Sequence, residues 1–373
     1  MARAPRTLLA KDLEDLAPYH SAWDGLAVAA GRPFAAPAWM LAWWREGRTG
    51  DARLRVVVVL DGDEPIGIGP FFAQVGPLGL AEYRLLGAGF CHRVGPIAAA
   101  GREEEVAAAI AAALAAADPA PASVVFEGID ARDRWPDQIR DHWPTRAQLR
   151  ADVAMDSPAI DLSAGYDEWL GRRDRKFRKE ARRVARRLEE EGVSRRIAAD
   201  DAAIEALLRL HYQRWDDRGG SNVGAEARAV LVDAARGLAE DGRLQIALLE
   251  GPDGPIAAEL VLRAGETAVF WGGGFDPAWS KLAPGMQTML LALEDAAAAG
   301  VEEADLGGGA HEYKRRLADA DRPVVWRTLL PVGARYPLIR LRLAPKHVRW
   351  AARDLLHRLP PRWQERIDRL RRR

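Results

Sequence analysis

Cysteine is almost missing from this chain of 373 residues, which contains only Cys91. One thiol cannot close a disulfide within the chain, and it cannot build the thiolate clusters that hold structural zinc or iron–sulfur groups. So little cysteine fits a reducing compartment, and we therefore expect a cytoplasmic protein without a metal site. A peripheral position at the inner face of the membrane is the alternative location.

Net charge is missing as well, since 54 Lys and Arg residues balance 54 Asp and Glu residues. A neutral chain gives no global argument for binding nucleic acid. The charge is nevertheless uneven, with ten Lys/Arg against two Asp/Glu in residues 171–187 and thirteen against three in residues 334–373. Both segments are local basic patches that can attract anions.

Long apolar runs are also lacking. The longest uncharged one, residues 106–117, is rich in alanine and too short to span a bilayer, and we expect no secretory leader before the charged residues 11–14. The chain contains no GxxxxGK[ST], HExxH or GxSxG motif. ATP hydrolysis, zinc-dependent hydrolysis and serine-hydrolase chemistry therefore lose their usual sequence support.

What the sequence does contain is an internal repeat. Two strand–turn–strand patterns, residues 53–72 and 243–262, place the same Arg-Leu pair twelve residues before a Pro-Ile pair. Each is followed by a Gly-rich loop ending in Phe (GAGF and GGGF), an Ala-rich helix and a short strand. The same order of elements in both halves predicts a duplicated α/β (α+β) fold, each copy a mixed sheet flanked by helices.

We accordingly predict three parts, namely an N-terminal domain over residues 1–155, a second domain over 156–333 and a basic amphipathic helical tail over 334–373. A long helix at 171–192 opens the second domain, with an apolar stripe and basic residues around it. Its basic face is either solvated or lines an anionic site. The tail can lie on an anionic membrane surface, dock on a partner, or pack on its own protein.

Two further segments have alternative interpretations. Trp39, Trp43 and Trp44 follow helical spacing, and we interpret them as core and interface packing. Residues 200–241 predict one or two helices interrupted by HYQRWDDRGGSN, which we interpret as an exposed, flexible loop that could act as a lid.

The stretch from Phe270 to Leu317 is the strongest candidate for the site. It predicts a strand, a Gly-rich loop, a helix that starts just after Pro284-Gly285, a short strand closing on Asp305, and a loop with His311, Tyr313 and Lys314. A helix N-terminus offers free N–H groups and the positive end of the helix dipole. The N–H groups of Met286, Gln287 and Thr288, with Lys281 nearby, would suit a pyrophosphate.

Several motifs in this stretch resemble the acyl-CoA half of GNAT-superfamily acetyltransferases, namely GGFDPAWSKLAPG, LEDAAAAG, ADLGGG and EYK. More narrowly, with PFAAPAWMLAWW and the PIGIGP and PIAAEL strands, residues 10–333 resemble the CelD-type family associated with bacterial cellulose and exopolysaccharide synthesis. The tandem plan is similar to that of the Fem peptidyltransferases, in which an aminoacyl-tRNA replaces acyl-CoA.

The resemblance implies acetyl-CoA or another acyl-CoA as co-substrate, with its pyrophosphate at the start of the helix and its pantetheine along the preceding strand. The loop reads KLAPGM, where the family has Arg/Gln-x-x-Gly-x-Gly/Ala. The implied binding residues are Trp271, Gly272, Gly273, Gly274, Lys281, Ala283, Gly285, Met286, Gln287 and Thr288. The matching segment of the first half, CHRVGPIAAAGREEE, lacks such a helix start, and we expect it to shape the acceptor cleft.

Acyl transfer needs a base for the acceptor, stabilisation of the oxyanion and a proton for the leaving group. Glu259 interrupts an apolar strand, where desolvation can raise the pKa of its carboxyl; the alternative is a solvated or Arg-paired side chain. The GNAT resemblance implies Tyr313 as the acid, and Lys314 resembles the Lys of the Fem plan that neutralises charge. His311 is a second candidate base or a solvated loop residue, and Asp305 is expected to orient the loop.

These observations favour an acyl-CoA-dependent N- or O-acyltransferase that acts by direct transfer. Its acceptor would be a sugar, a polysaccharide precursor or another small amine. An aminoacyl-tRNA-dependent transferase is the first alternative, which the basic helix at 172–187 supports. The second is a non-catalytic assembly protein that docks on a membrane-associated polysaccharide synthase through its tail.

Overall fold

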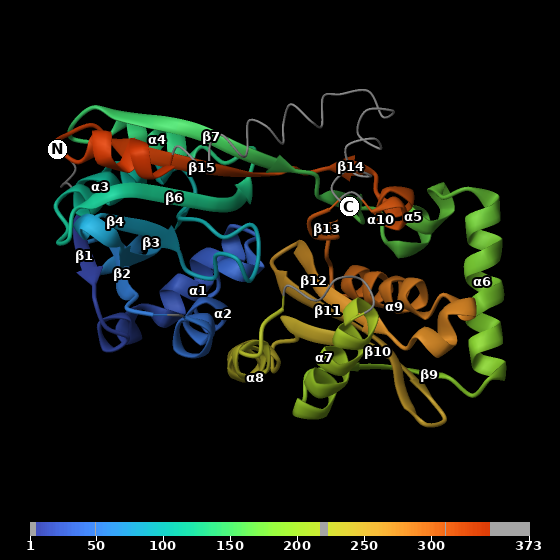
Figure 1. Cartoon of the computed structure of the whole chain (residues 1–373). Helices are drawn as coiled ribbons and strands as arrows, with labels where there is room; N and C mark the ends of the chain where they lie inside the picture. Colours follow the sequence, from blue (N-terminus) through green and yellow to red (C-terminus); the bar gives the residue numbers. More distant parts are fainter. Residues whose placement is uncertain (1–4, 49, 217–222, 310, 344–373) are drawn as a thin grey trace, which may run out of the picture.

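Two mixed β-sheets, each flanked by helices, make up the computed structural model, which describes residues 5–48, 50–216, 223–309 and 311–343 (Figure 1). The first sheet has the strand order β1-β2-β3-β4-β6-β15-β7, with the short β5 paired to β3. Its strands are β1 (Arg6–Ala10), β2 (Arg53–Asp61), β3 (Glu64–Val75), β4 (Ala81–Leu85), β5 (Ile97–Ala98), β6 (Pro121–Asp130), β7 (Ala147–Met155) and β15 (Val324–Pro331).

The second sheet has the order β14-β8-β13-β12-β11-β10-β9. Its strands are β8 (Pro158–Asp161), β9 (Ser194–Ala198), β10 (Leu244–Gly251), β11 (Gly254–Ala264), β12 (Thr267–Phe275), β13 (Glu303–Asp305) and β14 (Ala320–Asp321). Read from β9, this order matches the first sheet read from β1, position by position. The internal repeat predicted from the sequence is therefore present in the topology.

The two sheets also share the same connection after their antiparallel strands. In the first sheet β4 leads through helix α3 (Glu103–Ala115) to β6, which pairs parallel to β4. In the second, β12 leads through helix α9 (Pro284–Ala298) to β13, which pairs parallel to β12. The alanine-rich helices provide the crossover that a parallel pair needs, because a tight turn cannot join two parallel strands.

In each sheet one strand comes from a distant part of the chain: β15 in the first sheet and β8 in the second, which occupy equivalent positions. Beside β6 lies β15, from the C-terminal side of the second sheet, and beside β13 lies β8, from the segment that leaves the first sheet. Residues 324–331, which the predicted division places in the second domain, thus complete the first sheet between β6 and β7. β15 covers the edge of β6, whose backbone N–H and C=O groups would otherwise be unpaired.

The helices largely follow the predicted pattern, but the long helix at 171–192 is two helices. They are α5 (Tyr166–Arg172) and α6 (Arg175–Glu190). The break falls at Asp174, whose side chain caps α6 by accepting a hydrogen bond from the Phe177 N–H at 2.8 Å. The other helices are α1 (His20–Ala29), α2 (Pro37–Ala42), α4 (Trp135–Asp141), α7 (Asp201–Asp216), α8 (Ala227–Leu238) and α10 (Glu312–Leu317).

Two segments predicted as loops are helical. Residues 211–216 of the predicted lid continue α7, while residues 217–222 lie outside the described residues. Tyr313 and Lys314 lie on the short helix α10, and His311 is its N-cap residue. Both segments carry side chains of the candidate site, so their helical geometry fixes the directions of those side chains.

The described part of the C-terminal tail packs on its own protein. Residues 336–343 are helical, and Ile339 and Leu343 are buried against Leu80 and Leu330 of the first half. The rest of the predicted amphipathic tail, with its apolar stripe from Val348 to Leu370, lies outside the described residues. Among the residues that are described, no helix has the length and apolar character needed to cross a membrane.

Tryptophans link the core to the junction between the halves. Trp39, Trp43 and Trp44 are all buried, as their helical spacing predicts. Trp39 also contacts Phe90 of the first half and Trp271 of β12, with ring centroids 5.7 and 6.4 Å apart. This aromatic cluster joins the two halves beside the candidate site.

Candidate active site

A cavity of about 470 Å³ lies where β12 and β13 diverge. β13 pairs only with Thr267–Val269, the first residues of β12, so the two strands separate beyond that point. The cavity is lined there by Phe270–Gly273 on one side and Leu306–Gly308 on the other. The first half closes it with Phe34 and residues 89–93, which include the first three residues of the segment predicted to shape the acceptor cleft.

Glu259 of β11 forms part of the cavity wall, although only 7% of the residue is exposed. Its partner in the β11–β12 register is Gly273, and a Cβ at residue 273 would lie 2.1 Å from the Glu259 Oε2. The carboxylate thus occupies the space that a side chain at 273 would fill. Burial raises the pKa of Glu259 to about 7, against the opposing charges of Arg214 and Lys314. A carboxyl in that range can accept a proton at neutral pH.

Tyr313 of α10 also lines the cavity. Its pKa is raised by burial and then by the negative charge of Glu259, while Arg214 opposes the shift. The phenol is therefore protonated at neutral pH and can donate its proton. His311 stacks on it, with ring centroids 5.9 Å apart and planes 16° apart. His311 lines the cavity as well, but it is exposed, whereas Glu259 is desolvated.

Lys314 is held by the loop that follows β13. Its Nζ donates hydrogen bonds to the carbonyl oxygens of Gly307 and Gly308, each at 3.1 Å. Burial lowers the pKa of this amine, and the charges of Glu259 and Asp305 partly offset the effect. Lys314 therefore both closes the glycine loop and brings a positive potential into the cavity beside Glu259.

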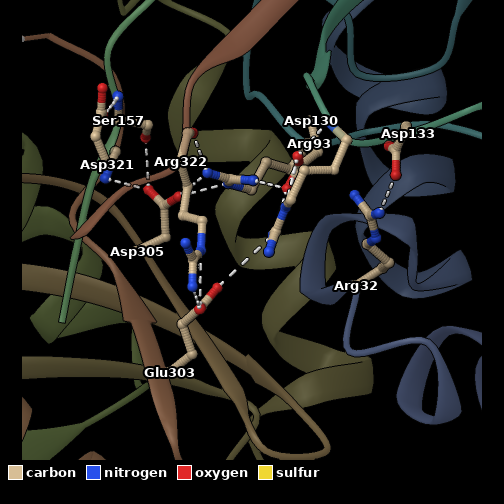
Figure 2. Close-up of polar contacts among 11 residues, drawn as sticks. Arg32, Arg93, Asp130, Asp133, Ser157, Glu303, Asp305, Asp321 and Arg322 are labelled. Carbon is tan, nitrogen blue, oxygen red and sulfur yellow. Dashed lines mark hydrogen bonds and ion pairs between the residues drawn. The ribbon is translucent and has the colours of Figure 1, made fainter. Parts of the chain in front are cut away.

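Arg93 ties the first half to this loop (Figure 2). Its guanidinium donates to Asp305 at the end of β13, to the Asp130 Oδ2 at the end of β6 at 2.5 Å, and to the carbonyl oxygen of Arg322 at 2.6 Å. Asp305 in turn accepts from the Ser157 Oγ at 2.8 Å and from the Gly307 N–H at 2.6 Å. Asp305 thus orients the loop, as predicted, and it does so through a buried ion network that reaches both sheets.

The electrostatics of this network agree with its geometry. Burial alone would raise the pKa of Asp130, but hydrogen bonds from Arg132 and the charge of Arg93 outweigh it and leave the pKa below its ordinary value. Arg93 itself has a positive φ of 59°, which is uncommon outside glycine. The backbone at Arg93 is therefore held in a costly conformation that aims its side chain at both carboxylates.

The cavity lining includes several residues that were not predicted as site residues, among them Arg93, His211 and Arg214. His211 and Arg214 come from the segment interpreted as a lid, although His211 continues the helical stripe of Ala203 and Leu207, which could have placed it on the buried face. The His211 Nδ1 lies 3.3 Å from the carbonyl oxygen of Gly273, and burial lowers its pKa. The Cζ of Arg214 lies 6.0 Å from the Tyr313 ring centroid.

The predicted pantetheine strand is divided between the cavity and the core. Trp271, Gly272 and Gly273 line the cavity, and the Trp271 Nε1 donates to the carbonyl oxygen of Phe90 at 2.9 Å. Gly274 does not line it; a Cβ there would lie 2.2 Å from the backbone of Leu210. Glycine at 274 instead lets α7 approach β12 closely.

The predicted pyrophosphate site also lies outside the cavity lining. The residues concerned are Lys281, Ala283, Gly285, Met286, Gln287 and Thr288. The N–H groups of Met286 and Gln287 donate to the carbonyl oxygen of Ala283 at 3.0 and 3.3 Å. The side chain of Gln287 donates to the carbonyl oxygen of Ala181 in α6, and the hydroxyl of Thr288 donates to that of Pro284. The start of α9 thus does not fit the row of free donors that a pyrophosphate needs.

No group of three or more His, Cys, Asp or Glu side chains within the described ranges is arranged to hold a metal ion. The cavity instead combines a buried carboxyl, a protonated phenol and a buried amine between two sheets of matching topology. Two mixed sheets of matching topology in tandem, each flanked by helices, define a GNAT-like class of fold.

Comparison with known proteins agrees with that class. Residues 175–315 match the model of an acetyltransferase (GNAT) domain, and the chain thus carries a GNAT-type domain over strands β9 to β13 of its second sheet. A search of curated proteins found no significant match. Among solved structures, FemX is similar over 90% of this chain and 99% of its own, with 11% identity and a TM-score of 0.67.

Two further structures share the fold. The C-terminal domain of a putative lysylphosphatidylglycerol synthetase from Agrobacterium fabrum is 13% identical, with 87% of this chain and 95% of its own covered and a TM-score of 0.54. A conserved protein of unknown function from Bacteroides thetaiotaomicron VPI-5482 is 11% identical, with 87% and 100% covered and a TM-score of 0.52. At these identities the likeness concerns the fold, and the substrates must be argued from the cavity.

Proposed function

We propose that this protein is an acyltransferase that moves an acyl group from an activated donor directly to an amine or hydroxyl bound in the cavity. The observation that carries the proposal is Glu259, a buried carboxyl with a pKa of about 7 in the cavity wall. Structural carboxylates of this chain are instead paired with arginine, as Asp130 is with Arg93. Within the described ranges Glu259 has no such clamp, and its carboxylate faces Gly273.

The residues divide the proton transfers between them. The acceptor nitrogen or oxygen forms the new bond to the acyl carbon while its proton passes to Glu259. The bond to the leaving group then breaks, and Tyr313 supplies the proton that the departing sulfur or oxygen takes up. Lys314, whose position the carbonyls of Gly307 and Gly308 fix, stabilises the negative charge that develops on the acyl oxygen.

The acceptor is a small polar molecule, because a cavity of about 470 Å³ is in the range of small-molecule sites. Its lining mixes aromatic rings such as Phe90 and Trp271 with the polar side chains of His92 and Ser157. A sugar or an amino sugar suits such a lining, since its ring can pack on aromatic faces while its hydroxyl groups find polar partners. This is also the acceptor class that the CelD-type resemblance implies.

Acyl-CoA is the proposed donor, as the GNAT match favours. Charged tRNA is the second candidate. One observation supports it, namely that two of the three N–H groups predicted to hold the CoA pyrophosphate already donate to Ala283. A donor that binds elsewhere in the cavity would leave these two hydrogen bonds to Ala283 intact.

The test combines binding with turnover. Isothermal titration with acetyl-CoA and longer acyl-CoAs measures donor binding, and release of the CoA thiol onto Ellman's reagent measures transfer to a panel of amino sugars and small amines. Cys91 does not interfere, because it is buried and burial raises the pKa of its thiol to about 12. We expect Glu259→Gln to lower the rate by about 100-fold or more, in the range of a general base, whereas Glu266→Gln, on an exposed turn, leaves it unchanged.

Two outcomes would contradict the proposal. If no acyl-CoA binds at millimolar concentration, acyl-CoA is not the donor, and retention of charged tRNA at low salt then tests the second candidate. If transfer occurs but Glu259→Gln keeps the wild-type rate, Glu259 is not the base.

A further inference from the structure

Helix α6 presents a face made almost wholly of lysine and arginine. Its apolar side chains Phe177, Val184 and Leu188 are buried against the second half of the molecule. At 3.6 residues per turn, Lys179, Arg182 and Arg186 point to the opposite side. The exposed cations of the helix are Arg175, Lys176, Lys179, Arg182, Arg183, Arg186 and Arg187.

These cations are largely unpaired, which sets them apart from other arginines of the chain. Among the described residues, Arg183 alone of the seven has a carboxylate partner, Glu180 at 2.6 Å. Elsewhere arginines at the surface of the second half pair with carboxylates, as Arg322 does with Glu303. Like charges three and four residues apart on a helix repel one another. The helix therefore carries a charge density that the fold itself does not use.

The position of α6 makes this face available. The helix stands at the edge of the second half, on the side away from the first sheet (Figure 1). Its long side chains enclose a shallow groove of about 680 Å³ that, among the described residues, is lined by α6 alone. At 1.5 Å per residue, the helix is a straight cationic ridge about 24 Å long.

We propose that α6 docks this protein on an anionic phospholipid surface. A convex ridge that is cationic from Arg175 to Arg187, with glutamates at 180, 189 and 190, can meet a plane of phosphate headgroups, and the guanidinium fork pairs well with phosphate. The apolar face of α6 is buried in its own protein, so binding is adsorption by charge and not insertion into the acyl chains. This docking does not depend on the proposed acyl transfer.

A nucleic acid is the other polyanion that such a face could meet, and the structure favours it less. Single strands are held by aromatic side chains on which bases stack, inside a groove with basic walls. The only aromatic residue of α6, Phe177, is buried, and no second element in the described part of the chain forms a wall of the groove. The ridge therefore suits a plane of charge better than a strand of bases.

The test is co-sedimentation of the full-length chain with vesicles, at about 0.15 M salt, where only strong surface electrostatics survive. Vesicles of phosphatidylcholine alone are compared with vesicles that contain about one third phosphatidylglycerol. The variant K179Q/R182Q/R186Q removes three exposed cations from the ridge. The control R53Q/R134Q/R236Q removes three exposed arginines elsewhere, so both variants keep the basic C-terminal tail and have the same net charge.

We expect the wild type to bind the anionic vesicles and not the neutral ones. Each neutralised cation should weaken binding about fivefold, so the α6 variant should lose about 100-fold in partition coefficient. The control should remain within about threefold of the wild type. Circular dichroism melting checks the fold, and glutamine is a good helix former at exposed positions. If the triple variant does not fold, the single variants Arg182→Gln and Arg186→Gln provide the same comparison at about fivefold each.

Three results would overturn the proposal. The first is that the wild type binds neither kind of vesicle. The second is that the α6 variant and the control lose affinity equally, which would indicate general charge attraction. The third is that bulk tRNA binds at the same salt and α6 neutralisation abolishes that binding while vesicle binding is unchanged, which would make α6 a nucleic-acid surface.

Discussion

Glu259 and Gly273 face each other across the β11–β12 pair, and the carboxylate of one fills the space that a side chain on the other would need. A glycine at 273 therefore leaves room for the side chain of its cross-strand neighbour. It lets a charged group lie inside the wall of the cavity, where burial raises the pKa of that group to about 7. The glycine at 273 on β12 and the acidic residue on β11 form one packing unit.

Gly273→Ala should disrupt that unit. The new Cβ would meet the Glu259 Oε2 at 2.1 Å and the carbonyl oxygen of Ala258 at 2.7 Å, so both the side chain and the backbone must move. Overpacking of this kind costs about 1–3 kcal/mol, measurable as a lower free energy of unfolding in urea. Gly272→Ala is the matched control, because the nearest atom, His211 Nδ1, lies 4.0 Å away. Equal losses in both variants would contradict this account.

The stability of the wild type should depend on pH through Glu259. Burial raises its pKa from an ordinary value of 4.5 to about 7, so the folded state binds more protons than the unfolded state between these values. The stabilising contribution is complete below about pH 4.5 and is lost as pH rises through about 7.

Glu259→Gln removes that dependence. The unfolding free energy of the wild type, minus that of the variant, should fall by up to about 3 kcal/mol between about pH 4.5 and 8. Denaturant titrations of both proteins across this range measure it. The acyl-transfer rate should change in the opposite direction, rising through about pH 7 as the carboxylate loses its proton. A difference in unfolding free energy that stays constant with pH would show that Glu259 titrates normally.

Arg93→Gln should be strongly destabilising. Asp130 and Asp305 are each 2% exposed, and the variant would leave both carboxylates without their shared guanidinium. Breaking a buried ion pair from one side costs about 3–5 kcal/mol. The exposed pair of Arg228 and Glu205 provides the control, since Arg228→Gln should cost below about 1 kcal/mol. Urea unfolding of both variants makes the comparison, and similar small losses would mean that the network does not hold the two halves together.

Much of this fold was predictable because each hairpin and helix of the repeat is formed by residues that are neighbours in the sequence. Hydrophobic periodicity and turn residues identified the β2–β3 and β10–β11 hairpins and the helices α3 and α9, each within a few residues. Glu259 stood out for a related reason, since an acidic residue in an apolar strand is desolvated unless it faces solvent or pairs with arginine; its burial is confirmed, and its role as a base stays a prediction. Tyr313 and Lys314 followed from the GNAT resemblance, and the structure places them in the same cavity as Glu259.

The parts that escaped prediction depend on contacts between distant segments. β15 joins β6 across nearly two hundred residues, and only the unpaired edge of the first sheet explains where it lies. Arg93 meets Asp305 in the same way, across the junction of the halves. The α9 start was misleading because Pro-Gly marks a helix N-terminus equally well whether its N–H groups are free or bonded within the turn, as those of Met286 and Gln287 are.

The junction beside the cavity can be tested through Cys91. Its thiol is buried, accepts a hydrogen bond from the Trp39 Nε1 at 3.2 Å, and has a pKa of about 12, so it should stay unmodified by Ellman's reagent until the junction opens. The neighbouring residue Phe90 is held from the second sheet by Trp271, through the hydrogen bond to its carbonyl oxygen at 2.9 Å and ring centroids 5.1 Å apart.

Trp271→Ala removes both contacts. Removal of a packed aromatic ring costs about 3–5 kcal/mol when the ring is fully buried, and Trp271 is half-buried. The variant should therefore lower the free energy of local opening by well over about 1 kcal/mol. The rate of Cys91 modification in the native protein should therefore rise at least about tenfold. Trp279→Ala is the control, because Trp279 packs on a separate apolar cluster with Ile256 and Leu282 and should leave the rate unchanged. Equal rates in the wild type and Trp271→Ala would show that the thiol is protected by the first half alone, and that the second sheet does not hold the loop that closes the cavity.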